Sequence, residues 1–177
     1  FERGTSVYLP DRVIPMLPFE LSNGICSLNE GEDRLTVSVF AEIDRDGKVL
    51  GSQIFESVIN SKHRMTYNNV DKIIDGDEGL RAKYACLAPV IDKMNELRLI
   101  LEKRRKEAGY VELDVREGDI TLDGGKISVS LHKATPATKL IEQFMILANE
   151  QVAEYLFYGN YPCVFRVHEK PSTEKLE

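Results

Sequence analysis

The chain has 177 residues and a mass of 20.1 kDa, enough for one domain with a core of its own. Its 42% hydrophobic and 29% charged residues are typical of a soluble globular protein, and no apolar run approaches the roughly 18 residues of a membrane span, which argues against a membrane protein. The 29 acidic and 23 basic residues give an isoelectric point of about 5.2, which argues against the strongly basic surface of many nucleic-acid-binding domains.

The cysteines and the ends of the chain give two further expectations. Cys26, Cys86 and Cys163 are odd in number and form no CxxC pair, which favours a reducing, cytoplasmic setting over a disulfide framework or a zinc site. Phe1 stands where an initiator methionine would, and the final stretch, HEKPSTEKLE, closes no recognisable element. We therefore expect a piece of a longer chain.

The first part of the chain predicts a rigid strap, a helical turn and a hairpin. Residues 3–18 form the strap, because its three prolines fix φ and disfavour helices and regular ladders. The stretch LPFELSNG at its end predicts one helical turn that stops at Asn23-Gly24. Alternating apolar and polar residues over 35–43 predict a strand with one buried face. Asp46-Gly47 is a favoured hairpin turn before a return strand over about 48–59, with Gly51 as a candidate bulge.

The middle of the chain predicts two or three helices. Helical spacing starts at Thr66, pauses over 75–79 and resumes as far as the charged run EKRRKE, where Gly109 stops it. Pro89 has no amide hydrogen to donate, so a break is expected near Ala88 with a fresh helix start at Pro89.

The last part predicts a small meander, a long helix and a final strand. Three strands alternate over 111–131 around the turn Asp123-Gly124-Gly125. Thr135 caps and Pro136 opens a helix to about Tyr158, followed by the strand CVFRV. The expected inward stripe of this helix is Ile141, Met145, Ala148, Val152 and Leu156. This order predicts an α+β fold, a mainly antiparallel sheet with hairpins packed by long helices.

Tyr8, in the strap, is the first candidate contact residue. Rigid backbone holds its ring outside regular structure, so the ring either packs into the core or serves as a platform on which a base stacks. Composition and spacing alone favour the core.

Tyr67 closes the stretch SKHRMTY, between a strand end and a helix start. Lys62, His63 and Arg64 beside an aromatic residue suit a phosphate with its base, and the helix N-terminus adds a positive end. The alternative is a solvated basic loop, which such a short triplet by itself favours.

Glu142 is the third candidate, because with Asn149 it edges the apolar stripe of the long helix. A half-buried carboxylate at a cleft could accept hydrogen bonds from the hydroxyls of a ribose. A structural glutamate bonded to a neighbouring loop is the equally weighted alternative.

The other charged groups favour ordinary surface roles. EGED at 30–33 and DGDE at 75–78 lack the 12-residue loop of a calcium hand and predict solvated turns rather than metal sites. His132 and His168 have no partners at zinc-ligand spacing, and no serine or cysteine resembles a nucleophile elbow.

Three longer stretches resemble the catalytic domain of the ribonuclease R and ribonuclease II exoribonucleases. They are RGTSVYLPDRVIPMLPFELSNGICSLNEGEDRL, SVINSKHRMTYNNV and KLIEQFMILANEQVAEYL, followed by FRVHEKPSTEKL. They span almost the whole chain in the family's order, and LSNGICSLN and HEKPS are closer to ribonuclease R.

This resemblance implies a magnesium-dependent enzyme that hydrolyses single-stranded RNA processively from its 3′ end to nucleoside 5′-monophosphates. We also expect a monomer in the cytoplasm, with neither DNA nor a membrane as partner. Residues 1–177 would then be part of the RNB catalytic domain, truncated at both ends. In the family, the tyrosine matching Tyr8 packs on the last nucleotides and helps set the length of the end product. The tyrosine matching Tyr67, beside Arg64, contacts the threaded strand, and the glutamate matching Glu142 contacts the terminal nucleotide.

Two departures from the family pattern limit these expectations. Leu113 stands where ribonuclease II has a second stacking aromatic, so no base clamp is expected there. The family's four catalytic aspartates and its assisting arginine are expected before Phe1 and after Glu177, so this chain would hold no catalytic residue and no metal ligand. The chain alone is then expected to be inactive. Two alternatives stay open, an RNA-binding pseudoenzyme that does not cleave and a protein-binding scaffold.

Overall fold

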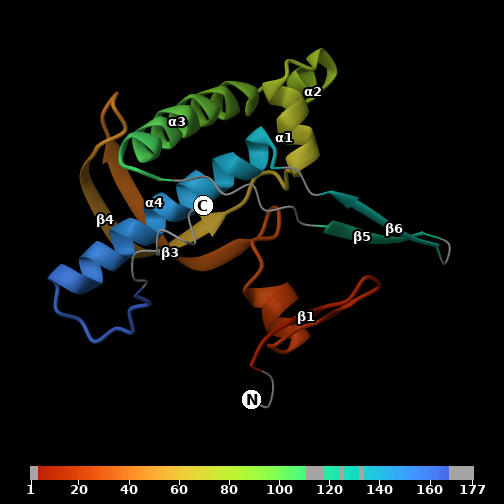
Figure 1. The fold of residues 1–177 in the computed structure, drawn as a ribbon, viewed down its shortest axis with the longest axis horizontal. Helices are drawn as coiled ribbons and strands as arrows, with labels where there is room; N and C mark the ends of the chain where they lie inside the picture. The colour runs from red at the N-terminus through yellow and green to blue at the C-terminus, as the bar shows by residue number, and fades with distance from the viewer. Residues whose placement is uncertain (1–3, 111–117, 124–125, 132–133, 168–177) are drawn as a thin grey trace, which may run out of the picture.

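Helices and antiparallel hairpins make up the computed structural model, which describes residues 4–110, 118–123, 126–131 and 134–167 (Figure 1). The fold is α+β, as predicted. Within the described residues, the named strands form three two-stranded sheets, and each pair is antiparallel. The elements in chain order are β1 (Val7–Tyr8), β2 (Val13–Ile14), η1 (Glu20–Ile25), β3 (Asp33–Ile43), β4 (Val49–Asn60), α1 (Tyr67–Ile74), α2 (Glu78–Lys83), α3 (Ala88–Glu107), β5 (Gly118–Asp123), β6 (Lys126–Leu131) and α4 (Pro136–Tyr158).

The long hairpin β3–β4 forms where the alternation predicts it. Its turn is held by the Asp44 carboxylate, which accepts hydrogen bonds from the backbone N–H groups of Asp46 (3.0 Å) and Lys48 (2.8 Å). Gly47 takes φ +78°, a conformation that glycine adopts without strain. The bulge lies at Leu50, since Glu42 pairs with Gly51 and Ile43 with Val49.

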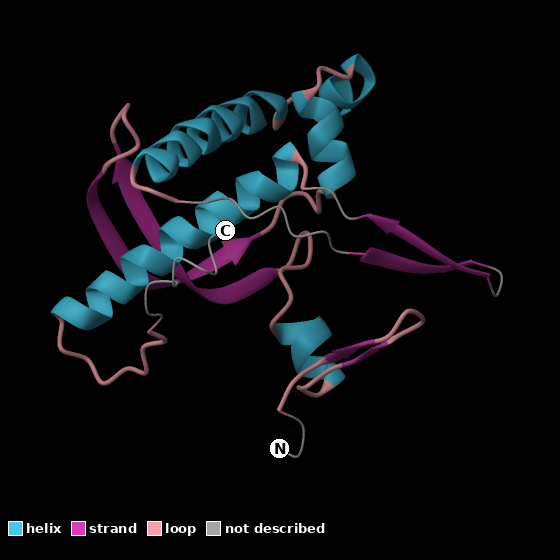
Figure 2. Cartoon of the chain, viewed as in Figure 1, coloured by secondary structure: helices cyan, strands magenta, loops and turns pink. Residues whose placement is uncertain are grey.

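Only one end of the hairpin's apolar face is covered. Figure 2 shows α4 crossing the β3–β4 hairpin and the end of α3 beside the hairpin tip, and α4 contacts β3. Val39, Ala41 and Ile43 face Leu97 and Phe144 there. The residues at the start of the same face, Leu35 and Val37, are 88% and 69% exposed, so the prediction of a fully buried face is wrong for this part of the strand.

The helices α1, α2 and α3 form a small core around Ile73, Ala88 and Ile91. The Thr66 hydroxyl caps α1 by accepting a hydrogen bond from the Asn69 N–H (3.3 Å). The predicted break before α3 and the stop after it are both confirmed, the latter at Gly109 with φ +94°. Among the described residues, no helix combines the length and the apolar composition that crossing a membrane requires.

The helix α4 begins and ends where the sequence predicts, but it buries only part of the predicted stripe: Ala148, Val152 and Leu156 are half-buried. Thr135 and Thr138 form a capping box at its start. Its buried residues are Ala137, Leu140, Gln143 and Gln151, whereas Ile141 and Met145 of the predicted stripe are 39% and 59% exposed. Because α1, α3 and β3 all pack on α4, its inward face is set by these neighbours and includes two glutamines.

Three further predictions need correction, and a fourth lies outside the described residues. The strap pairs with itself as the β1–β2 hairpin instead of staying outside regular ladders. The helical turn does not stop at Asn23-Gly24 but continues to Ile25. CVFRV, residues 163–167, forms no strand, since no described strand pairs with it. The predicted strand at 111–115, with Leu113, lies outside the described residues, but the hairpin after it is present as β5–β6.

An ion pair between Arg81 and Asp92 joins α2 to α3. Arg81 donates to both carboxylate oxygens (3.0 and 2.6 Å) and to the carbonyl oxygen of Ile73 (2.9 Å). The hydrogen bond from Arg81 lowers the pKa of Asp92 below its ordinary value. The stabilisation is therefore fully present above the unfolded-state pKa and is lost as the pH falls through the folded-state pKa.

We expect Asp92→Asn to lower the free energy of unfolding of this chain at neutral pH. The difference from wild type should shrink as the pH falls below about 3.9, the ordinary pKa of an aspartate. Urea unfolding at neutral and acidic pH measures it, with Glu107→Gln, from the exposed pair Lys103–Glu107, as the control. A difference in the free energy of unfolding between Asp92→Asn and wild type that does not change with pH would contradict the role of the Arg81–Asp92 ion pair.

Candidate nucleic-acid interface

An open hollow of about 750 Å³ lies where the loop after β4 meets α1, α3 and α4. We call it the Tyr67 hollow. Its rim is polar and basic and its floor is apolar. The residues that line it are Lys62, His63, Arg64, Met65, Thr66, Tyr67, Val70, Leu87, Val90, Ile91, Met94, Ala137, Leu140 and Ile141.

The basic loop on the rim is anchored to the turn before β3. The Arg64 N–H donates a hydrogen bond to the Glu30 carboxylate (2.6 Å), and the Gly31 N–H donates to the carbonyl oxygen of Ser61 (2.7 Å). Glu30 was predicted to belong to a solvated turn, and it is exposed, yet it fixes the loop backbone. The side chain of Arg64 is left exposed at the rim.

The ring of Tyr67 stands at the first position of α1 and is 52% exposed. A helix N-terminus offers unpaired N–H groups and a partial positive charge to an anion. Lys62 and Arg64 are exposed beside it, and Val90, at the hollow, is 51% exposed. This arrangement suits a phosphate at the rim and a base or sugar against the ring and the apolar floor.

His63 is held between two neighbours on the helical side of the loop. Its ring makes an edge contact with Tyr84 (centroids 6.0 Å apart), and its Nε2 lies 3.8 Å from the Cys86 sulfur. These contacts turn His63 toward the α2–α3 connection, so Lys62 and Arg64 are the more available cations of the triplet.

Glu142 does not line the Tyr67 hollow, although its neighbour Ile141 does. Its exposed side chain borders a small recess with the cationic residues Arg105, Lys106 and Lys139. The structure therefore brings Tyr67 and Arg64 together at the Tyr67 hollow. Glu142 follows Ile141 of that hollow by one position, but its side chain borders a different recess with cationic residues.

Tyr8 lies apart from these residues. It pairs with Val13 in the β1–β2 hairpin, which Figure 1 shows at the lower edge of the molecule, away from α1 and α4. Its side chain is 77% exposed, so within the described residues it is not a core tyrosine. It remains available for stacking, but it does not share a site with Tyr67 here.

The family comparison covers the whole sequence. The sequence model of the RNB domain matches residues 1–177. The chain belongs to the RNB family. Similar curated proteins include ribonuclease R of Thermotoga maritima, 47% identical over 99% of this chain and 25% of that protein. Ribonuclease R of Escherichia coli is 39% identical over 98% of this chain and 22% of that protein. The chain thus spans about a quarter of the length of the relatives it matches.

Solved structures show the same fold. Mycoplasma genitalium RNase R in complex with double-stranded RNA matches this RNB chain with a TM-score of 0.83 and 28% identity, over 97% of this chain and 31% of that one. The complex of the same enzyme with ribose-methylated single-stranded RNA gives 0.82 and 28% identity, over 97% of this chain and 27% of that one. Yeast Ssd1, a pseudonuclease, shares the fold at a TM-score of 0.62 and 18% identity, over 88% of this chain and 18% of that one.

The residues of this RNB chain that the structure describes do not provide a magnesium site. No three of its described histidines, cysteines, aspartates and glutamates come together as metal ligands. Asp77 of DGDE caps α2 instead, by accepting a hydrogen bond from the Leu80 N–H (2.8 Å). No catalytic step can therefore be derived through a metal in this part of the domain.

Sequence reasoning missed the floor of the Tyr67 hollow. Val90 and Met94 come from α3 and Ile141 from α4. Ile141 was assigned to the inward stripe of its helix, and Val90 and Met94 were not singled out. The sequence signal for this floor was the apolar face of α4, which is wider than its neighbours cover. The packing of α1, α3 and α4 then shows which part of that face stays uncovered.

Proposed function

We propose that this chain is part of the catalytic RNB domain of a processive 3′-to-5′ exoribonuclease, which hydrolyses single-stranded RNA to nucleoside 5′-monophosphates. The observation that carries the proposal is the 47% identity to a ribonuclease R over 99% of the chain. The exposed ring and cations of the Tyr67 hollow support it, because they are the groups with which proteins hold a single strand.

Each candidate residue has a role in this proposal. Arg64 and the N-terminus of α1 bind backbone phosphates, while Tyr67 packs on a base of the threaded strand. Glu142 accepts hydrogen bonds from the ribose of the terminal nucleotide. Tyr8 stacks on the last nucleotides of the strand and sets the length of the end product.

The remaining parts of the enzyme are proposed to lie outside this chain. Magnesium would be held by aspartates that precede Phe1, and the chain alone would cleave nothing. We place the full-length protein in the cytoplasm as a monomer, acting on RNA and not on DNA. The alternative, an RNA-binding pseudoenzyme, differs in one observable respect: it binds single-stranded RNA and releases no nucleotides.

The test is degradation of a 5′-labelled RNA oligonucleotide by the full-length protein with and without magnesium. We expect magnesium-dependent release of monophosphates and one short limit product. Tyr8→Ala should lengthen that product and leave cleavage intact, because the exposed ring no longer supports the last nucleotides. Phe19→Ala, from another exposed aromatic of the same region (65% against 77% for Tyr8), is the control. An unchanged limit product would refute the role of Tyr8, and binding without release would favour the pseudoenzyme.

A further inference from the structure

The acidic turn EGED, residues 30–33, lies beside the basic loop of residues 61–64. The turn leads into β3 and the loop follows β4, so the antiparallel pairing of the two strands brings them to the same end of the hairpin. Asp33 pairs with Asn60 at this end, and Glu30 and Ser61 form an isolated bridge beyond it. The carboxylates of the acidic turn are therefore placed where they can act on the basic loop.

Two of the three carboxylates of the acidic turn hold the basic loop. Glu30 accepts a hydrogen bond from the Arg64 backbone N–H (2.6 Å). Asp33 accepts one from the side-chain amide of Asn60 (2.8 Å). The amide oxygen of Asn60 in turn accepts a hydrogen bond from the Lys62 ammonium (2.8 Å). Hydrogen bonds with a charged partner are stronger than neutral ones, so the turn fixes the backbone at Arg64 and the head group of Lys62.

The third carboxylate, Glu32, points to a different partner. It forms an ion pair with Arg34, which also donates to the carbonyl oxygen of Ser27 (2.9 Å). Glu30 and Glu32 carry the same charge, are both exposed and lie two residues apart. They therefore form a matched pair, in which Glu30 contacts the basic loop and Glu32 contacts Arg34.

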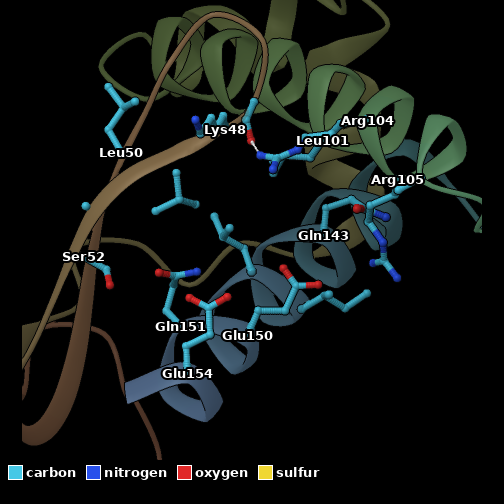
Figure 3. Close-up of a pocket in the computed structure, with 16 residues that line it drawn as sticks. Lys48, Leu50, Ser52, Leu101, Arg104, Arg105, Gln143, Glu150, Gln151 and Glu154 are labelled. Carbon is cyan, nitrogen blue, oxygen red and sulfur yellow. Dashed lines mark hydrogen bonds between the residues drawn. The ribbon is translucent and has the colours of Figure 1, made fainter. Parts of the chain in front are cut away.

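The opposite end of the β3–β4 hairpin is held by α3 (Figure 3). There Arg104 donates a hydrogen bond to the carbonyl oxygen of Gly47 at the hairpin tip. Because the tip is fixed by this contact, the position of the basic loop depends on the contacts at its own end of the hairpin. Arg64 lies three residues before Tyr67, so its hydrogen bond to Glu30 sets where the loop meets the start of α1.

We propose that Glu30 is a positioning residue for RNA binding, which holds the Arg64 backbone so that the guanidinium meets a phosphate of the strand. The inference rests on the proposed function, because it assumes that Arg64 binds RNA phosphates. Ordering a side chain during binding costs free energy, and a loop that is already held in place does not incur this cost at that step.

Electrostatics and positioning predict opposite effects of removing Glu30. A carboxylate beside the path of the phosphates repels them, so the loss of its charge alone would strengthen RNA binding. If Glu30 positions Arg64, its removal weakens binding although a repulsive charge is lost. The sign of the change therefore decides between the two roles.

The test is fluorescence anisotropy of the full-length protein with a labelled single-stranded RNA, without magnesium. We expect Glu30→Ala to weaken the affinity about two- to twelvefold, the range for immobilising one side chain on binding. Glu30→Gln keeps an oxygen that accepts the Arg64 N–H and should bind at least as tightly as wild type. Glu32→Ala removes the same charge from the same turn and should not weaken binding. Lys48→Met, which removes an exposed cation at the hairpin tip (Figure 3), should leave the affinity near wild type.

Arg64→Met separates this inference from the proposed function. We expect Arg64→Met to weaken RNA binding, and Glu30→Ala to cost less in that background than in wild type, because no guanidinium is left to position. Wild-type affinity of Arg64→Met would overturn both the role of Arg64 and the inference. A loss in Arg64→Met together with unchanged or tighter binding by Glu30→Ala would overturn the inference alone. Equal losses in Glu30→Ala and Glu30→Gln, or strict additivity in the double variant, would overturn it as well.

Discussion

Replacing Tyr67 with alanine weakens the affinity of the full-length protein for single-stranded RNA by roughly five- to 150-fold. Stacking of one base on an aromatic side chain contributes about 1–3 kcal/mol, and the Tyr67 ring at the start of α1 lines the hollow beside the basic loop. Fluorescence anisotropy with a labelled oligonucleotide, without magnesium, measures the effect free of degradation.

Matched variants distinguish stacking from a change in fold. Tyr67→Phe keeps the ring and should retain most of the affinity. Tyr155→Ala removes a ring of equal exposure, 52%, that stacks on Tyr161 at the far end of α4, and should leave RNA affinity near wild type. Equal losses in Tyr67→Ala and Tyr155→Ala would show that the Tyr67 hollow is not the binding surface.

The sequence predicts best the features that have a local cause. Thr135 and Pro136 start α4 as expected because capping depends on a few consecutive residues. Gly109 ends α3, and Gly47 completes the hairpin turn, because each takes a positive φ. These assignments require no knowledge of what packs against the segment.

The faces that elements bury could not be predicted in the same way. Met145 was expected inside and is exposed, whereas Gln143 is buried, because the neighbours of α4 decide which side is covered. Leu35 alternates correctly for a buried face, but no described element covers it. The 163–167 segment has strand composition without a partner strand. Periodicity reports which residues could be buried together, and tertiary contacts select among the choices.

In the candidate site, too, features with a local cause were predictable and features that depend on tertiary contacts were not. The sequence links Arg64 to Tyr67 because both lie in one short loop before a helix, and the structure brings them to one hollow. Tyr8 and Glu142 were joined to them only by the family resemblance, and in the described residues they lie on other surfaces. Contacts between segments that are distant in the sequence depend on the whole protein. The relatives of this chain are about four times as long as the part that they share with it.

Replacing Gly47 with alanine should cost about 2–4 kcal/mol in the free energy of unfolding, the largest effect on stability that we expect from one methyl group. Gly47 is buried with φ +78°, where a side chain is strained. A Cβ built there meets Cγ2 of Ile100 on α3 at 2.9 Å. The same residue's carbonyl oxygen accepts a hydrogen bond from Arg104, so the turn cannot move away from α3 without losing it.

Gly109→Ala separates the two contributions to the cost of Gly47→Ala, the backbone strain at positive φ and the contact with Ile100. Gly109 has φ +94°, but a Cβ there meets nothing within 4 Å, so this variant should lose only the conformational share, about 1–2 kcal/mol. Adding Ile100→Ala to Gly47→Ala removes the opposing methyl group and should make the pair less costly than the sum of the single changes. Urea unfolding of the four variants measures these differences. Equal losses for Gly47→Ala and Gly109→Ala, with strict additivity in the double variant, would mean that the hairpin tip does not press against α3.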